Sequence, residues 1–131
     1  MNQSQLLSVR VLVVDDSPDI REVVVQMLEH HGATVTEVGT AEEALDVLKA
    51  SRPDVLLSDL EMPGKDGYWL IDRVRALGPD RGGLTPAACL TARVDPETRA
   101  SVLKAGFQYH IPKPPDMSRL VGIVGILALK P

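Results

Sequence analysis

Short apolar runs alternate along the chain with longer segments of helical periodicity, and this alternation narrows the choice of fold. The runs predicted to be strands are Val9–Val14, Ala33–Val38, Val55–Ser58, Pro86–Leu90 and Gln108–Ile111. Strands that alternate with helices are typical of βαβ units, in which the strands are parallel and the crossovers right-handed. The pattern therefore predicts an α/β fold with helices on both faces of one parallel sheet.

The segments between the runs carry helix signals. Ser17-Pro18 offers an N-cap and a proline at the first helical position, and Thr40–Glu43 has the form of a capping box. Further helices are expected over Leu70–Leu77, after Asp95-Pro96 and after Asp116. Positions expected to face the sheet include Ile20, Val23, Val24, Met27 and Leu28 in the first helix, and Val102 and Leu103 in the fourth. Five such units predict a flavodoxin-like (βα)5 three-layer sandwich with strand order 2-1-3-4-5.

Composition limits the class of protein. The chain has 131 residues, 44% of them hydrophobic, which suits one domain with a real core; we expect it over residues 9–129, after an N-terminal tail at 1–8. A net charge of −4 without a basic stripe argues against nucleic-acid binding. No signal peptide and no apolar stretch approaching roughly 20 residues is visible, so we expect no membrane insertion and a cytoplasmic location. The single Cys89 lies in an apolar run, which favours a buried, reduced thiol.

Four of the predicted strands run into a polar residue. The first runs into Asp15-Asp16, the third into Asp59, the fourth into Thr91 and the fifth into Lys113. Because ligands of open parallel sheets bind at the carboxyl ends of the strands, we expect these side chains at one edge. Carboxylates suit a hard divalent cation such as Mg²⁺, and a hydroxyl and an ammonium suit a phosphoryl group.

Each of these residues also has an ordinary structural explanation. One aspartate of the Asp15-Asp16 pair can cap the next helix, and Thr91 can cap the segment that follows it. Asp59 can be a solvated strand end, and Lys113 can be a surface lysine. Their occurrence together at the ends of successive parallel strands is much less expected by chance.

The chain resembles the response-regulator receiver domains of two-component phosphorelay signalling. The resemblance rests on four motifs in order, Val11–Asp16, Ser58–Pro63 with Asp66-Gly67, Leu90–Ala92 and Lys113-Pro114, and extends from Val9 to about Leu129. It implies a signalling module that catalyses only its own phosphorylation and dephosphorylation and is not an enzyme with an external substrate. A histidine kinase or a histidine phosphotransfer protein would supply the phosphoryl group.

The resemblance also assigns roles. Asp59 is then the phosphoacceptor, Asp16 binds Mg²⁺ directly, Asp15 binds it mostly through water, and Glu61 offers its backbone carbonyl. Thr91 and Lys113 contact the phosphoryl group, and the Lys113-Pro114 bond is a candidate for the cis form. The face formed by the fourth helix, the fifth strand and the last helix is expected to be the output surface, with a homodimer as one use; it carries Arg99, Lys104, His110, Gly122 and Gly125.

Two positions depart from the common pattern. The family usually has Tyr or Phe three residues before the lysine as a switch coupled to the threonine, whereas this chain has His110, and Tyr109 is expected on the other face of the strand. An imidazole is smaller than a phenol ring and can carry charge near neutral pH, and a polar ring here resembles receivers of hybrid sensor kinases. The second departure is the pair Glu61 and Arg93, expected at the rim of the site.

Two other functions remain open. A phosphatase with an aspartate nucleophile would share the fold, the carboxylate and Mg²⁺, but such enzymes usually carry a second aspartate where this chain has Glu61. A flavin or nucleotide carrier would share the fold, but it needs a glycine-rich phosphate loop where Asp15-Asp16-Ser17-Pro18 stands. Turnover of an organic phosphate, or a bound chromophore, would distinguish these functions from self-phosphorylation.

Overall fold

A computed structural model describes residues 5–129 and confirms the predicted alternation of strands and helices. Within this range the strands are β1 (Arg10–Val14), β2 (Thr34–Val38), β3 (Val55–Asp59), β4 (Ala87–Thr91) and β5 (Tyr109–Pro112), and the α-helices are α1 (Pro18–His30), α2 (Ala41–Ser51), α3 (Gly67–Arg75), α4 (Pro96–Ala105) and α5 (Met117–Leu127). A short 3₁₀ turn, Pro79–Arg81, lies in the long loop before β4.

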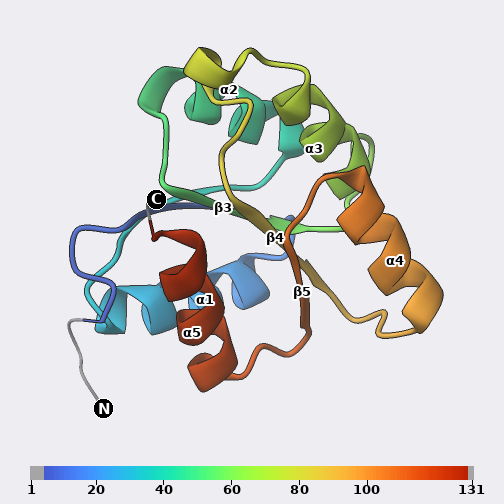
Figure 1. Cartoon of the computed structure of the whole chain (residues 1–131). Helices are drawn as coiled ribbons and strands as arrows, with labels where there is room; N and C mark the ends of the chain where they lie inside the picture. Colours follow the sequence, from blue (N-terminus) through green and yellow to red (C-terminus); the bar gives the residue numbers. More distant parts are fainter. Residues whose placement is uncertain (1–4, 130–131) are drawn as a thin grey trace.

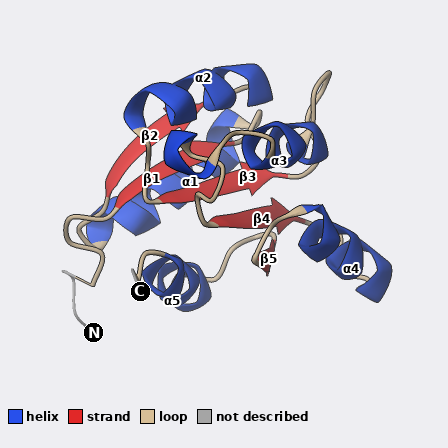
Figure 2. Ribbon diagram, turned by 45° about the horizontal axis from the view of Figure 1, so that its top comes forward, coloured by secondary structure: helices blue, strands red, loops and turns tan. Residues whose placement is uncertain are grey.

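The strands form one sheet in the order β2-β1-β3-β4-β5, and all neighbouring pairs are parallel, as predicted. Helices α1 and α5 cover one face of the sheet, while α2, α3 and α4 cover the other (Figure 1). Because all neighbouring strands are parallel, their carboxyl ends share one edge, and the arrows of β3 and β4 can be followed in the same direction in Figure 2. This layered architecture is flavodoxin-like.

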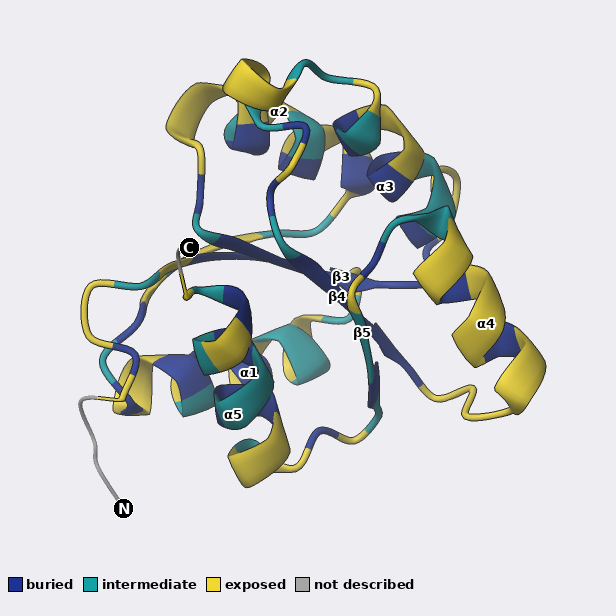
Figure 3. Cartoon of the chain, in the orientation of Figure 1, coloured by how far each residue is buried: buried dark blue, intermediate teal, exposed yellow. Residues whose placement is uncertain are grey.

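The core lies in two layers, one on each face of the sheet. Val11 and Val13 of β1 point to the α1 and α5 side, whereas Leu12 and Val14 point to the side of α2 and α3. Figure 3 shows the central strands buried along most of their length. A strand covered on both faces cannot alternate apolar with polar residues, which explains the nearly continuous apolar runs of β1, β3 and β4.

Two side chains expected to face the sheet are exposed instead. Val23 of α1 is 43% exposed and Leu103 of α4 is 44% exposed, because α1 buries Val24 and Val25, and α4 buries Thr98 and Val102. The other expected positions hold: Val24, Leu28 and Val102 are buried, and Ile20 and Met27 pack against the core, so each helix differs from the expectation at one position.

The start of the described chain packs against the core. Leu6 is fully buried in the layer between α1 and α5, and its backbone N–H donates to the carbonyl of His31 at 2.8 Å. The N–H of Val9 donates in turn to the carbonyl of Leu6. Part of the segment expected as a tail therefore adds apolar contacts beside the sheet.

The α-helices within residues 5–129 begin at residues whose side chains accept hydrogen bonds from the first turn. These residues are Ser17, Thr40, Asp66, Asp95 and Asp116. Side-chain caps of this kind satisfy backbone N–H groups that have no partner inside the helix. None of the helices in the described range is both long and apolar enough to cross a bilayer.

Candidate functional site

The polar residues at the strand ends meet at the carboxyl edge of the sheet. Asp15 follows β1, Asp59 ends β3 and Lys113 follows β5, and all three are largely buried. Thr91 is 1% exposed and ends β4, whose Leu90 pairs in register with Asp59. The site is therefore assembled from four strands by the topology of the sheet.

Lys113 joins the two buried carboxylates. Its Nζ lies 2.9 Å from Oδ1 of Asp59 and 3.0 Å from Oδ2 of Asp15. The peptide bond between Lys113 and Pro114 is cis, as the resemblance implied. One ammonium group thus balances part of the negative charge that the strand ends bring together.

The backbone holds Asp15 in a fixed orientation. Its Oδ1 accepts from the N–H of Ser17 at 2.9 Å, and its carbonyl accepts from Nη1 of Arg21 at 2.7 Å. Arg21 is itself fixed by Glu37 on the edge strand, at 3.0 Å. The sequence interpretation missed these supports. The Asp15-Asp16-Ser17 pattern does carry a signal for the first of them, because aspartate side chains often accept from the N–H two residues later.

Asp59 is placed by the turn that follows it. The N–H of Gly67 donates to the carbonyl of Leu60 at 2.9 Å, and a Cβ on Gly67 would lie 2.5 Å from the carbonyl oxygen of Asp59. Only glycine allows the start of α3 to approach the end of β3 this closely. The requirement for glycine at this position thus comes from the geometry of the site.

Burial dominates the electrostatics of Asp59. The pKa of Asp59 is raised to about 6, chiefly by burial and also by the nearby charge of Asp15, against the opposing effect of Lys113. For Lys113, burial lowers the pKa, but the bonds to Asp59 and Asp15 outweigh this effect and hold the pKa above its ordinary value. Ionised Asp59 is therefore costly in the metal-free protein, and an added cation would relieve that cost.

We expect Asp59→Asn to stabilise the metal-free protein at about pH 8, by roughly 1–3 kcal/mol in the free energy of unfolding. The pKa of Asp59 is higher in the folded protein than in the unfolded one. The stability linked to its protonation is therefore complete below about pH 4 and is lost as the pH rises through about 6. Asparagine removes that loss, although it also takes one partner from Lys113.

Urea unfolding in EDTA at about pH 8 and at about pH 4 measures the effect, and the difference between variant and wild type should shrink toward zero at the lower pH. Asp46→Asn, an exposed change on α2 with the same loss of charge, is the matched control. A stabilisation of equal size at both pH values would contradict the expectation.

Three carboxylates form a cluster that could hold a divalent cation. Oxygens of Asp15, Asp16 and Asp59 all lie within 4.8 Å of one another. Oδ2 of Asp15 is buried and, although Lys113 is at ion-pair distance, it accepts no well-directed hydrogen bond from any residue in 5–129. An oxygen-only donor set with a buried, poorly satisfied oxygen fits a hard cation such as Mg²⁺.

Thr91 is linked to His110 through the backbone of one residue. The N–H of Arg93 donates to Oγ1 of Thr91 at 3.0 Å, and the carbonyl of Arg93 lies 2.8 Å from Nε2 of His110. That short contact requires the proton on Nε2, so it fixes both the tautomer and the orientation of the ring. Tyr109, the neighbour of His110, packs against the core layer of α1 and α5, on the opposite face of β5 as expected.

Glu61 and Arg93 meet above the site. Nη1 of Arg93 lies 3.9 Å from Oε2 of Glu61, and both side chains are exposed, so this pair adds little stability. The carboxylate of Glu61 is thus directed to the rim. The expectation that its backbone carbonyl binds a metal stays a prediction.

Cys89 on β4 pairs in register with Ser58, next to Asp59, but it is not a reactive group of the site. The thiol is fully buried and free, as the apolar run suggested. Burial raises the pKa of Cys89 to about 12, and the charge of Asp59 raises it as well. The thiol is therefore not a nucleophile at neutral pH, because the thiolate is the reactive form.

Comparison with known proteins agrees with this geometry. The family profile described as response regulator receiver domain matches residues 11–125. An uncharacterised 14.6 kDa protein of Leptolyngbya boryana is 43% identical over 119 residues, which cover 91% of this chain and 89% of that protein. The response regulator MprA of Mycobacterium bovis is 36% identical over 115 residues, which cover 88% of this chain and 48% of MprA.

A solved structure shows the same fold. The crystal structure of a putative response regulator from Chloroflexus aurantiacus has a TM-score of 0.86 and 31% identity, and the match covers 92% of this chain and 98% of that one. The chain spans about half or less of the larger regulators that it matches, such as MprA. The family match covers most of the chain and includes every strand-end residue of the site, so this chain belongs to the family of response regulator receiver domains.

Proposed function

We propose that this chain is a phosphoacceptor signalling module in which Asp59 receives a phosphoryl group and the resulting change of conformation controls a partner. The observation that carries the proposal is the contact of Lys113 Nζ with Asp59 at 2.9 Å, beside a cluster of three carboxylates at the strand ends. The donor would be a histidine kinase or a histidine phosphotransfer protein, which places the reaction in the cytoplasm. The only covalent reactions would be those on its own Asp59.

The residues of the site have distinct tasks in this reaction. An oxygen of Asp59 attacks phosphorus, a new P–O bond forms, and the bond from phosphorus to the donor atom breaks as the donor leaves. Lys113 stabilises the negative charge on the phosphoryl oxygens, and the hydroxyl of Thr91 donates to one of them. Before the phosphoryl group is transferred, Lys113 orients Asp59, and the Thr91 hydroxyl oxygen accepts from the N–H of Arg93.

The cation site is part of the proposal. Asp15, Asp16 and Asp59, with the backbone carbonyl of Glu61, would hold Mg²⁺, which supplies positive charge to the phosphoryl oxygens when bound. The chain's own contribution is to gather the carboxylates and to keep one oxygen of Asp15 without a directed hydrogen bond.

The alternative functions receive less support from the site. In a phosphatase with an aspartate nucleophile, the acid two residues later would face the substrate, whereas the carboxylate of Glu61 pairs with Arg93 at the rim. A nucleotide or flavin carrier would bind phosphate after β1, where Asp15 and Asp16 bring negative charge instead. Hydrolysis of p-nitrophenyl phosphate at many turnovers per molecule would favour the phosphatase.

The test of the proposal is the labelling of the wild-type chain. Incubation with acetyl phosphate and Mg²⁺ should add one phosphoryl group per molecule, and EDTA should prevent the addition. Borohydride reduction of the acyl phosphate followed by peptide mapping should place the label on the peptide that contains Asp59. A label that is stable to mild base, or that maps to a serine or threonine peptide, would contradict an acyl phosphate.

We also expect the ring of His110 to change its environment when the site is filled. If Thr91 turns its hydroxyl to a phosphoryl oxygen, Arg93 loses its acceptor on Thr91, and the contact between the Arg93 carbonyl and His110 is disturbed. NMR of the imidazole nitrogens with and without beryllofluoride should therefore show different signals for His110. Unchanged signals for His110, with clear shifts at Thr91, would rule out this role.

A further inference from the structure

Arg21 connects three elements beside the carboxylate cluster. It lies near the start of α1, its Nη1 donates to the backbone carbonyl of Asp15 at 2.7 Å, and its Nε lies 3.0 Å from Oε1 of Glu37 on β2. The two contacts use different nitrogens of one planar group, so the position of each partner restrains the other. The side chain of Arg21 is only 21% exposed, which limits competition from water for these contacts.

The carbonyl that Arg21 contacts belongs to the peptide bond between Asp15 and Asp16. Carboxylate oxygens of both aspartates belong to the cluster that could hold a divalent cation. The N–H of Asp15 donates to the carbonyl of Val38, at the end of β2, at 3.3 Å. Rotation of the peptide that leads into Asp16 would break the contact with Arg21. The exposed carboxylate of Asp16 projects from this peptide, so its direction depends on how the peptide is oriented.

Glu37 offsets the charge that Arg21 brings to the cluster. A guanidinium group near the carboxylates repels a divalent cation and would by itself lower the affinity of the site. The carboxylate of Glu37 offsets part of that charge through Nε, while Nη1 donates to Asp15. Lysine has a single side-chain nitrogen, so it cannot make the two contacts through separate atoms. The arginine therefore supplies a directed hydrogen bond while part of its repulsion of the cation is cancelled.

We propose that Arg21 is a positioning residue that raises the affinity for Mg²⁺ by fixing the peptide between Asp15 and Asp16, and that Glu37 acts through Arg21. The inference rests on the proposed function, because that function includes Mg²⁺ at this cluster. Loss of a group that orients metal ligands typically costs about 10- to 100-fold in metal affinity. If Arg21 acted only by its charge, its loss would tighten Mg²⁺ binding, whereas the loss of a positioning residue weakens binding.

The test is a titration of the ¹⁵N-labelled full chain with MgCl₂, at constant ionic strength and at about pH 8, where Asp59 is ionised. The amide signals around the cluster report the dissociation constant. Arg21→Met should weaken Mg²⁺ binding by about tenfold, and Arg21→Lys, which keeps the charge, by about threefold or more. Glu37→Gln should weaken binding more in the wild type than in Arg21→Met, because its effect passes through Arg21.

The labelling reaction distinguishes positioning from a general loss of structure. With acetyl phosphate as donor, the loss of rate in Arg21→Met should be largest at low Mg²⁺ and should shrink as Mg²⁺ approaches saturation. A general loss of structure would lower the rate equally at every concentration of Mg²⁺. Urea unfolding in EDTA checks the fold of Arg21→Met, and if that variant is unfolded, Arg21→Lys and Glu37→Gln carry the comparison.

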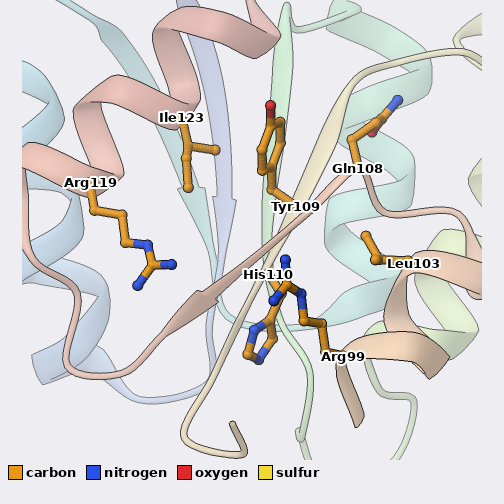
Figure 4. A pocket seen from close by; sticks show the side chains of 7 residues that line it. All are labelled: Arg99, Leu103, Gln108, Tyr109, His110, Arg119 and Ile123. Atoms are coloured by element: carbon orange, nitrogen blue, oxygen red, sulfur yellow. The ribbon is translucent and has the colours of Figure 1, made fainter. Parts of the chain in front are cut away.

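Two other arginines provide matched controls. Arg10, at the start of β1, also donates to backbone carbonyls, those of Ser51 and Arg52, but at the opposite edge of the sheet. Arg119 projects from α5 into a small pocket that none of the clustered carboxylates lines (Figure 4). Arg10→Met loses comparable backbone contacts and Arg119→Met loses the same charge, so both should bind Mg²⁺ within about twofold of the wild type.

The outcomes separate this inference from the proposed function. If Arg21→Met bound Mg²⁺ as tightly as the wild type or more tightly, the inference would be wrong and the proposed function would stand. Equal weakening in Arg10→Met would also overturn the inference, because the effect would not be specific to the cluster. If the wild type itself bound no Mg²⁺, the inference and the magnesium site of the proposed function would both be wrong.

Discussion

Replacing Asp59 with asparagine is expected to abolish phosphoryl transfer from acetyl phosphate, lowering the rate of labelling by at least about 100-fold. Asparagine has nearly the same shape as aspartate, but its neutral amide oxygen is a poor nucleophile toward phosphorus. The variant also loses the charge that pairs with Lys113 at 2.9 Å. Intact-mass measurement over a time course with acetyl phosphate and Mg²⁺ gives the rates of labelling of the wild type and of Asp59→Asn.

The controls for this prediction come from the same chain. Asp46→Asn changes the net charge equally on the exposed surface of α2 and should label as the wild type does. Asp15 is the other buried carboxylate beside Lys113, and in Asp59→Asn it is an alternative nucleophile within the same cluster. Labelling of Asp59→Asn at the wild-type rate would therefore contradict the assignment, and peptide mapping would show whether Asp15 had taken the label.

The architecture could be predicted because the burial of each strand determines which residue types it carries. Strands such as Val55–Asp59 are covered by helices on both faces, so most of their residues before the polar end are apolar, and such runs stand out in the sequence. The parallel topology then places Asp15, Asp59 and Thr91 at one edge, whatever their separation along the chain. The grouping of the site residues followed from the fold, whereas their individual roles rest on the family resemblance.

Details that depend on packing and loop conformation were not predictable. On α1 the second buried valine beside Val24 is Val25 and not Val23, because the two are the same residue type and the local pattern does not distinguish them. Burial of Leu6 depends on the space between α1 and α5, which no local pattern encodes.

The contact of His110 with the carbonyl of Arg93 spans 17 positions and depends on the path of the loop after β4. The sequence offers a histidine at the position of the usual aromatic switch, but nothing in the sequence orients its ring. In the structure a single 2.8 Å contact does so, and it ties the ring to the residue that also bonds Thr91.

Addition of Mg²⁺ is expected to raise the free energy of unfolding of the wild type, by about 2.7 kcal/mol at a concentration of about 100 times the dissociation constant. The reason is that the cluster of Asp15, Asp16 and Asp59 exists only in the folded chain. The effect should weaken as the pH falls below about 6, where Asp59 takes up a proton that competes with the metal. Urea unfolding at several concentrations of Mg²⁺ measures it.

Asp16→Asn separates metal binding from the stability of the fold. Asp16 is exposed, and Lys113 is shared by Asp15 and Asp59, so the metal-free variant should unfold within about 0.5 kcal/mol of the wild type. Any small change should be stabilising, because Asp16 is one of the groups that raise the pKa of Asp59. The gain in stability on adding Mg²⁺ should nevertheless be largely lost.

Glu29→Gln, which removes an exposed acid from the last turn of α1, should keep the full gain. If Asp16→Asn also kept the full gain, the cation would be held by the remaining ligands, and Asp16 would not be one of them. If neither the wild type nor the control were stabilised by Mg²⁺, the carboxylate cluster would hold no metal. The buried oxygen of Asp15 would then depend on Lys113 alone for a counter-charge.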